Sequence, residues 1–360
     1  MKRLKKNRVL LAGITLFFFF ALATAFYLSQ KTQETRKAAA PSADEETSLA
    51  SGLSAVNYYG TPLNVLKLFG QFELGETSED TPTKSKLFHP AGLAIDKSVT
   101  PNRIYVVDSG NNRILGFNGS GTCSGASCVD TDKPASIIIG QSDICGPSGC
   151  RGACNGDSNI GIHGQTAADK LCLMLYPWAT NIGESWGRIL IDVDSQGNLY
   201  VPDIGNNRIL KYNQPFGGDS VADFVWGQEN YTARDCNRGR GRNNPDNQSL
   251  CLDIKDTDTG SARGVSVDAS GNLWVADIFN HRVLRFPPGS KTADLVLGQT
   301  TFNTKTAVCS SNPTTTPLNT MCSPALARVN PQTGELFVMD EHPTYTSRIL
   351  VFAPPFTNGA

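Results

Sequence analysis

Four aspartates, each followed shortly by an arginine, form the most regular set of chemically active side chains in this sequence. The pairs are Asp108 and Arg113, Asp203 and Arg208, Asp277 and Arg282, and Asp340 and Arg348. Carboxylates that converge on one site could hold a metal ion or act in acid–base catalysis. A catalytic group is normally needed once, whereas these pairs recur with each repeat. The pattern therefore favours a structural role, in which each carboxylate accepts backbone N–H groups at a turn.

The histidines are the next candidates for a metal site, and they are His89, His163, His281 and His342. A catalytic zinc needs three protein ligands that converge on one point. His89 precedes Pro90, and His281 stands where two other repeats have the second asparagine of a turn. We interpret the histidines as surface or turn residues, and we expect no cofactor.

Two further clusters could bind charged ligands. Asp192, Asp194 and Gly197 resemble part of a calcium loop, but strands rather than helices are predicted on both sides, so we do not expect calcium there. A basic loop contains Arg234, Arg238, Arg240 and Arg242. It could bind an acidic or anionic-glycan ligand, or be an ordinary solvated loop. It lacks the nearby stacking aromatics of a nucleic-acid site.

These residues belong to a unit that recurs four times, starting at Gly92, Ile189, Gly264 and Leu326. Each copy begins with a strand in which small and apolar residues alternate, followed by a turn. A second, apolar strand ends at the aspartate. A second turn leads to the arginine and a third strand. An apolar run ending in Gly-Gln follows at Gly140, Gly227 and Gly298, and an earlier one ends at Gly70. Three strands and this fourth make one antiparallel blade. The sequence therefore predicts an all-β fold, a β-propeller of about four four-stranded blades.

The repeat resembles the NHL-repeat β-propeller family over about residues 62 to 356. The matching motifs are Gly197-Asn198, Gly271-Asn272, Asn111-Asn112-Arg113 and Asn206-Asn207-Arg208. The resemblance implies the fold and says little about function, because one fold hosts many functions. Peptidyl-α-hydroxyglycine lyase is an enzyme with a similar repeat pattern, and its zinc histidines each follow a proline. No histidine here follows a proline, so that ligand set is not carried over.

The ends of the repeat array predict how the ring closes. A lone fourth strand is expected at Val65–Gln71, and the last unit ends after three strands at Phe352. The lone strand could complete the last blade and close a four-bladed ring, although NHL rings commonly have six blades. The tail APPFTNGA resembles the linker NQPFGG after Tyr212, which suggests a truncated sequence. We expect a four-bladed array whose closure is imperfect or strained.

The N-terminus predicts export. Five basic residues within residues 1–8 precede an uncharged apolar stretch at 9–28, which is long enough to cross a bilayer as a helix of ~30 Å. A signal anchor is favoured over a signal peptide cut after Ala25, and either would export the chain. Residues 29–60 are predicted to be a flexible tether, and residues 61–360 the propeller.

The ten cysteines agree with export, because an even number in loops indicates disulfides. They are Cys123, Cys128, Cys145, Cys150, Cys154, Cys172, Cys236, Cys251, Cys309 and Cys322. Repeat equivalence predicts Cys236–Cys251 and Cys309–Cys322, then Cys154–Cys172. Cys145–Cys150 and Cys123–Cys128 remain as local pairs, and the connectivity among Cys145, Cys150, Cys154 and Cys172 stays open.

The overall charge limits the classes of binding partner that we expect. The formal net charge is −1, so there is no general attraction to nucleic acid or to an anionic membrane surface. We predict a non-enzymatic, exported and membrane-tethered propeller that binds a protein or glycan through its loop faces, with no nucleic-acid partner. The alternative is a propeller hydrolase, lactonase or lyase with a metal in the central channel.

Overall fold

The computed structural model describes residues 54–56, 62–64, 87, 90–118, 135–141, 165–173, 189–252, 263–309, 317–341 and 347–359. The chain divides into two units, Met1–Lys67 with Cys123–Val129 and Leu68–Thr122 with Asp130–Ala360. In the first unit, β1 (Ser54–Val56) pairs antiparallel with β2 (Pro62–Asn64). The predicted apolar span 9–28 and the predicted strand at Val65–Gln71 lie outside the described residues. Within them, no helix is long and apolar enough to cross a membrane.

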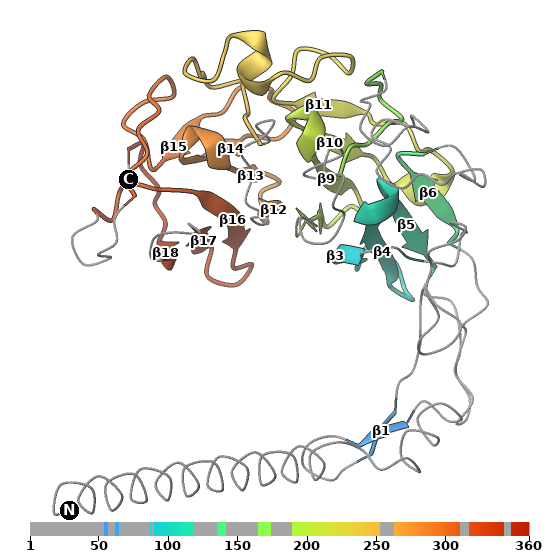
Figure 1. Cartoon of the computed structure of the whole chain (residues 1–360). Helices are drawn as coiled ribbons and strands as arrows, with labels where there is room; N and C mark the ends of the chain where they lie inside the picture. Colours follow the sequence, from blue (N-terminus) through green and yellow to red (C-terminus); the bar gives the residue numbers. More distant parts are fainter. Residues whose placement is uncertain are drawn as a thin grey trace, which may run out of the picture. The chain divides into compact units, whose positions relative to one another are not determined.

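The second unit contains the repeat, and its described strands form sheets that follow one another along the chain and are antiparallel except for one short pairing (Figure 1). Blade 1 contains β3 (Pro90–Asp96), β4 (Arg103–Asp108), β5 (Arg113–Phe117) and β6 (Ile137–Ile139). Blade 2 contains β8 (Asp192–Val193), β9 (Leu199–Asp203), β10 (Arg208–Tyr212) and β11 (Phe224–Trp226). Blade 3 contains β12 (Arg263–Val267), β13 (Leu273–Asp277), β14 (Arg282–Phe286) and β15 (Leu295–Leu297). Blade 4 is described with three strands, β16 (Pro324–Val329), β17 (Leu336–Asp340) and β18 (Arg348–Phe352).

This order confirms the predicted all-β class, and blades 1, 2 and 3 have the four antiparallel strands that are expected for a β-propeller. Each aspartate of the repeat ends the second strand of its blade, and each arginine begins the third strand directly opposite it. Short 3-10 turns join the two strands in blades 1, 2 and 3. The residue after each of these turns is left-handed: Asn112, Asn207 and His281 have φ of 51°, 51° and 56°.

The first strands of the blades lie next to one another. The short strand β7 (Ile189–Leu190), which leads into β8, pairs parallel with the start of β12. At Gly92 in β3 the backbones approach closely, because a Cβ there would lie 1.9 Å from the carbonyl oxygen of Ile189. A glycine is therefore required where blade 1 meets blade 2.

The core consists of the layers between neighbouring blades. One buried cluster runs through blades 1, 2 and 3, and includes Ile114, Val201 and Leu284. A second cluster lies between blades 3 and 4, where Trp274 and Val283 pack with Val338 and other apolar residues of blade 4. A blade inside the array is covered by a neighbouring blade on each of its two faces. Both faces of such a blade are therefore apolar.

The linker after the third strand of a blade returns to the blade before it. Phe216 of the linker after β10 stands edge-on to Tyr105 of blade 1, with ring centroids 5.2 Å apart. Phe356 of the linker after β18 makes the same contact with Trp274 of blade 3 at 4.8 Å. This shared contact gives a physical reason for the similar sequences of the two linkers.

Candidate functional site

The four aspartate–arginine pairs are ion pairs inside the blades. In each, the arginine Nε donates to the aspartate Oδ2, at 2.7 Å in blade 1, 2.6 Å in blade 2, 2.8 Å in blade 3 and 3.0 Å in blade 4. The aspartates are buried, and so are the arginines of blades 1, 2 and 3. Burial raises the pKa of Asp203, while the charge of Arg208 and hydrogen bonds to the carboxylate oppose the increase.

The second oxygen of the aspartates of blades 2, 3 and 4 holds the loop that enters the blade. The contacts are Cys172 N–H to Asp203 Oδ1 at 2.7 Å, Cys251 N–H to Asp277 Oδ1 at 2.7 Å, and Cys322 N–H to Asp340 Oδ1 at 2.9 Å. The left-handed residue of the preceding blade holds the same loop one residue later in two cases. Asn112 Oδ1 accepts from Leu173 N–H, and Asn207 Oδ1 accepts from Leu252 N–H, both at 2.7 Å.

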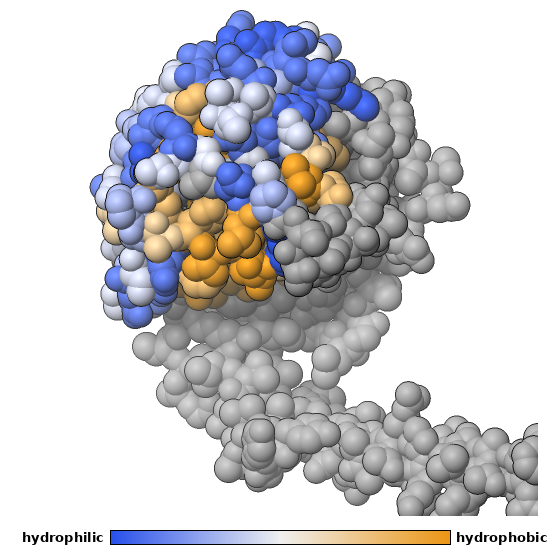
Figure 2. Space-filling view, turned by 90° about the vertical axis from the view of Figure 1, so that its left-hand side faces the viewer, coloured by the Kyte–Doolittle hydropathy of each residue, from blue (hydrophilic) through white to orange (hydrophobic). Residues whose placement is uncertain are grey.

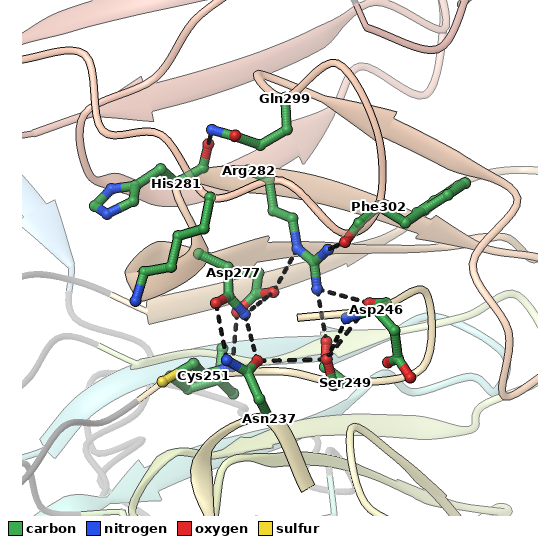
Figure 3. A network of polar contacts seen from close by, with 12 residues as sticks. Asn237, Asp246, Ser249, Cys251, Asp277, His281, Arg282, Gln299 and Phe302 are labelled. Carbon is green, nitrogen blue, oxygen red and sulfur yellow. Dashed lines mark hydrogen bonds and ion pairs between the residues drawn. The ribbon is translucent and has the colours of Figure 1, made fainter. Parts of the chain in front are cut away.

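The arginines of blades 2 and 3 also bind the loops on either side of their blade. The guanidinium group of Arg208 donates to the carbonyls of Ala167 and Lys170 before blade 2 and of Tyr231 after it. Figure 3 shows the equivalent network in blade 3, where Arg282 donates to the carbonyls of Asp246, Ser249 and Phe302. One ion pair therefore fixes two loops.

The Gly-Gln pairs complete this system. Gly227 has a φ of +85°, and a Cβ on it would lie 2.7 Å from Leu250 and 2.9 Å from the carbonyl oxygen of Asn207. The amide of Gln228 donates to the carbonyls of Asn207 and Asp235, at 3.1 and 2.9 Å. The glycine gives the backbone the turn that an L side chain would block, and the glutamine ties the next loop to the left-handed turn.

Disulfides close the loops at the same points. Cys236 is bonded to Cys251 and Cys309 to Cys322, the two pairs that repeat equivalence predicts first. Cys172 is also disulfide-bonded. Its predicted partner Cys154, and Cys123, Cys128, Cys145 and Cys150, lie outside the described residues.

The described histidine, His281, occupies the left-handed turn of blade 3. It is mostly buried, and its Nδ1 contacts the carbonyl oxygen of Cys322. Burial lowers the pKa of His281, so the neutral ring that donates from Nδ1 is favoured. This placement agrees with a turn residue. His89, His163 and His342 lie outside the described residues.

The basic loop neutralises part of its own charge. Arg238 pairs with Glu229 at 2.6 Å, and Arg240 pairs with Asp246 at 2.6 Å. Arg234 is exposed, and its backbone carbonyl accepts from Asn207. Arg242 is also exposed, and its carbonyl accepts from Lys305. The loop thus presents basic groups to solvent, and Arg238 and Arg240 are held in ion pairs.

Residues from all four blades line a pocket at the edge of the first strands, with a volume of about 570 Å³. Its polar groups include Asp192 and Arg328, whose side chains are 3.4 Å apart. The other Asp192 oxygen accepts from Val267 N–H of blade 3 at 2.9 Å. Leu93 and Ile95 of blade 1 give the pocket an apolar wall. The pocket suits a ligand that carries both apolar surface and charge.

Sequence reasoning missed this pocket, although a signal exists. Ala94, Asp192, Ser266 and Arg328 hold equivalent positions in the four repeats. They differ in chemistry, whereas the aspartates and arginines that support the fold are identical. Variation at a repeated position marks a surface that the fold does not dictate.

The carboxylate of Asp194, considered above for calcium, belongs to a turn. It accepts from the backbone N–H of Gln196 and Asn198, and from the Tyr200 hydroxyl at 3.1 Å. Among the described residues, no group of three or more His, Cys, Asp or Glu side chains is placed to hold a metal ion.

A second, smaller pocket of about 270 Å³ lies between blades 2 and 3. Phe224 and Trp226, two residues apart on β11, lie in its wall with tilted rings whose centroids are 4.4 Å apart. The ring centroid of Tyr200 lies 5.9 Å from that of Trp226. Lys211 and Asp223 add charges of both signs.

Comparisons with known proteins find partial likenesses. No protein-family profile matches the chain. A segment of 92 residues is 37% identical to peptidyl-glycine alpha-amidating monooxygenase of Mus musculus and 36% identical to the Rattus norvegicus protein. The match covers 25% of this chain and 8% of each of those proteins.

Among solved structures, an auxiliary nutrient binding protein from Bacteroides thetaiotaomicron aligns with a TM-score of 0.36 and 8% identity, over 72% of this chain and 47% of that one. A catalytically inactive virginiamycin B lyase from Staphylococcus aureus aligns with a TM-score of 0.32 and 12% identity, over 79% and 74%. A streptogramin B lyase aligns with a TM-score of 0.31 and 10% identity, over 85% and 62%.

Proposed function

We propose that the chain is an exported propeller of the NHL type, tethered by its N-terminal apolar segment, that binds an extracytoplasmic protein or glycan through its loop face. One observation carries the proposal. Long loops are held by the blade before them, the blade after them and a disulfide, as for Cys251 and Leu252. Such loops lose little conformational entropy when a ligand binds, which raises affinity.

The disulfides support a location outside the cytoplasm, because cytosolic thiols are kept reduced. The tether is tested by membrane fractionation of the native protein. A chain that stays in the membrane after salt and carbonate washes supports the anchor. A soluble chain that begins at Phe26 would replace the anchor with a cleaved signal peptide.

The ligand is tested with the purified chain on arrays of glycans and of secreted proteins. The double variant Arg234→Glu/Arg240→Glu should lose an anionic ligand that the basic loop binds, because the loop changes sign. Arg328→Ala should lose a ligand of the four-blade pocket. Lys291→Glu, a charge reversal at an exposed residue outside the loop and the pocket, is the matched control. If both variants bind the ligand as the wild type does, neither the basic loop nor the pocket is the binding site.

The alternative function is that of a hydrolase, lactonase or lyase with a metal in the channel. The observation that favours it is the charged pocket lined by all four blades. Elemental analysis of the purified protein separates the two: one tightly held zinc or calcium per chain, with turnover of an ester or lactone that Arg328→Ala abolishes, would establish the enzyme.

A further inference from the structure

Exposed apolar side chains gather at the two ends of the blade array. Of the seven large hydrophobic residues that are exposed among the described residues, five lie there. They are Leu93 and Ile95 on blade 1, and Phe337, Ile349 and Val351 on blade 4. Figure 2, which views the blade 4 side of the molecule, shows apolar side chains gathered there.

The blade 4 end face, formed by Phe337, Ile349 and Val351, has the design of a face between blades. Phe337 and Ile349 hold the repeat positions of Trp274 and Val283 in blade 3. Those two residues are 1% and 0% exposed, because blade 4 covers them. Ile349 is 65% exposed. The blade 4 end face therefore has the sequence of an inter-blade contact, and none of the four described blades covers it.

The blade 1 end face, formed by Leu93 and Ile95, is the other half of the same contact. These residues hold the repeat positions of Ala327 and Val329 in blade 4, which are 2% and 8% exposed because they pack against blade 3. Leu93 and Ile95 are 61% and 45% exposed. The chain thus carries both halves of one further inter-blade contact, one at each end of the array.

We propose that a second copy of this chain supplies the missing contact, with blade 4 of each copy packed on blade 1 of the other. The occupant must present a blade face complementary to the blade 4 end face, and the blade 1 end face is such a surface. The new contact continues a type of interface that already forms three times within the chain. A head-to-tail contact made twice about a two-fold axis closes a ring of two chains.

The oligomeric state of the full chain in detergent tests this proposal, with analytical ultracentrifugation corrected for bound detergent. The wild-type protein should have the mass of two chains. Leu93→Asp and Ile349→Asp should each weaken association by at least about tenfold, because each buries an unpaired carboxylate in both contacts. Leu318→Asp, at an exposed leucine outside the end faces, is the matched control and should remain dimeric.

Mixing the two variants makes the test specific. A pair of one Leu93→Asp chain and one Ile349→Asp chain keeps one of its two contacts intact, whereas each variant alone has lost both. Dimers should therefore reappear in the mixture. Dimers that form equally well with both substitutions present would show that the chains associate elsewhere, through the apolar N-terminal stretch for example.

Two other results would overturn the proposal. A monomer in which cysteines introduced as Leu93→Cys and Ile349→Cys resist thiol labelling would show that the chain covers its own end faces. A monomer that is labelled readily at both positions would show that nothing covers them. Near-ultraviolet circular dichroism like that of the wild type confirms that each variant is folded.

Discussion

Asn207 of blade 2 accepts a hydrogen bond from the backbone N–H of Leu252, 45 residues further along the chain, at 2.7 Å. The neighbouring N–H, that of Cys251, is bound by Asp277 of blade 3. Two consecutive backbone groups are thus divided between two blades, and the joint between the blades depends on the left-handed conformation of one asparagine.

Substitutions at Asn207 should separate the hydrogen bond from the backbone conformation. Asn207→Gly removes the acceptor but tolerates the φ of 51°, and it should lower the free energy of unfolding by about 1–3 kcal/mol. Asn207→Ala adds the strain of a left-handed residue, about 1 kcal/mol more. Urea titrations measure both values, and equal losses would show that the conformation adds nothing.

Removal of Asp277 should destabilise the protein strongly, because Arg282 would remain as a buried charge without its partner. We expect Asp277→Ala to cost about 3–5 kcal/mol, and Asp277→Ala/Arg282→Met to recover part of it. The purified single variant should still bind ligand at low temperature if it is folded. A variant that keeps the normal melting temperature but has lost all ligand binding would show that this pair belongs to the binding site and does not serve stability.

The stability of the protein should decrease as the pH falls. Burial lowers the pKa of His281 in the folded state, whereas in the unfolded chain it is near 6.5. Below about pH 6.5 the unfolded chain binds more protons, so stability decreases until the lower folded pKa is reached. His281→Asn, which restores the residue of blades 1 and 2, should reduce this slope. An unchanged slope in denaturant titrations between about pH 8 and about pH 5 would assign it to other groups.

Gly227→Ala should be among the most damaging single-methyl changes, since the added Cβ meets the carbonyl oxygen of Asn207 at 2.9 Å and φ is +85°. We expect a loss of more than about 2 kcal/mol. Gly217→Ala, where a Cβ meets nothing within 4 Å, is the matched control and should be near neutral. Similar melting temperatures for the two variants would contradict the close approach.

Loss of the disulfide between Cys236 and Cys251 should destabilise the chain by about 3 kcal/mol in the chain-entropy account, since the bond closes a loop of 15 residues. The variant Cys236→Ser/Cys251→Ser is compared with the wild type in oxidising buffer. Alkylation of the native protein without reductant should leave both cysteines unmodified, and ready labelling of either would contradict the pairing.

The sequence predicted the parts of the molecule that repeat. The alternation from Leu273 to Asp277 and the arginine that follows are local patterns, so the strands and the turn between them could be recognised. The role predicted for Arg282 was incomplete. Its bonds to carbonyls such as that of Ser249, 33 residues away, depend on loops whose sequences do not repeat. The pocket was missed because Asp192 and Arg328 belong to different blades and meet only in three dimensions.

The joint between blades also bears on how such a chain could lengthen. A segment that runs from Asn207 to the residue before His281 starts with the acceptor half of one joint and ends just before the next. Duplication of that segment would add a blade with a complete joint on each side, without any compensating substitution. The duplicated segment would then begin and end about half a blade away from the boundaries of the structural blade. Asn207, Asp277 and Arg282 hold the last residues of this loop, from Asp246 to Leu252, so the stretch before Asp246 can change in length and content.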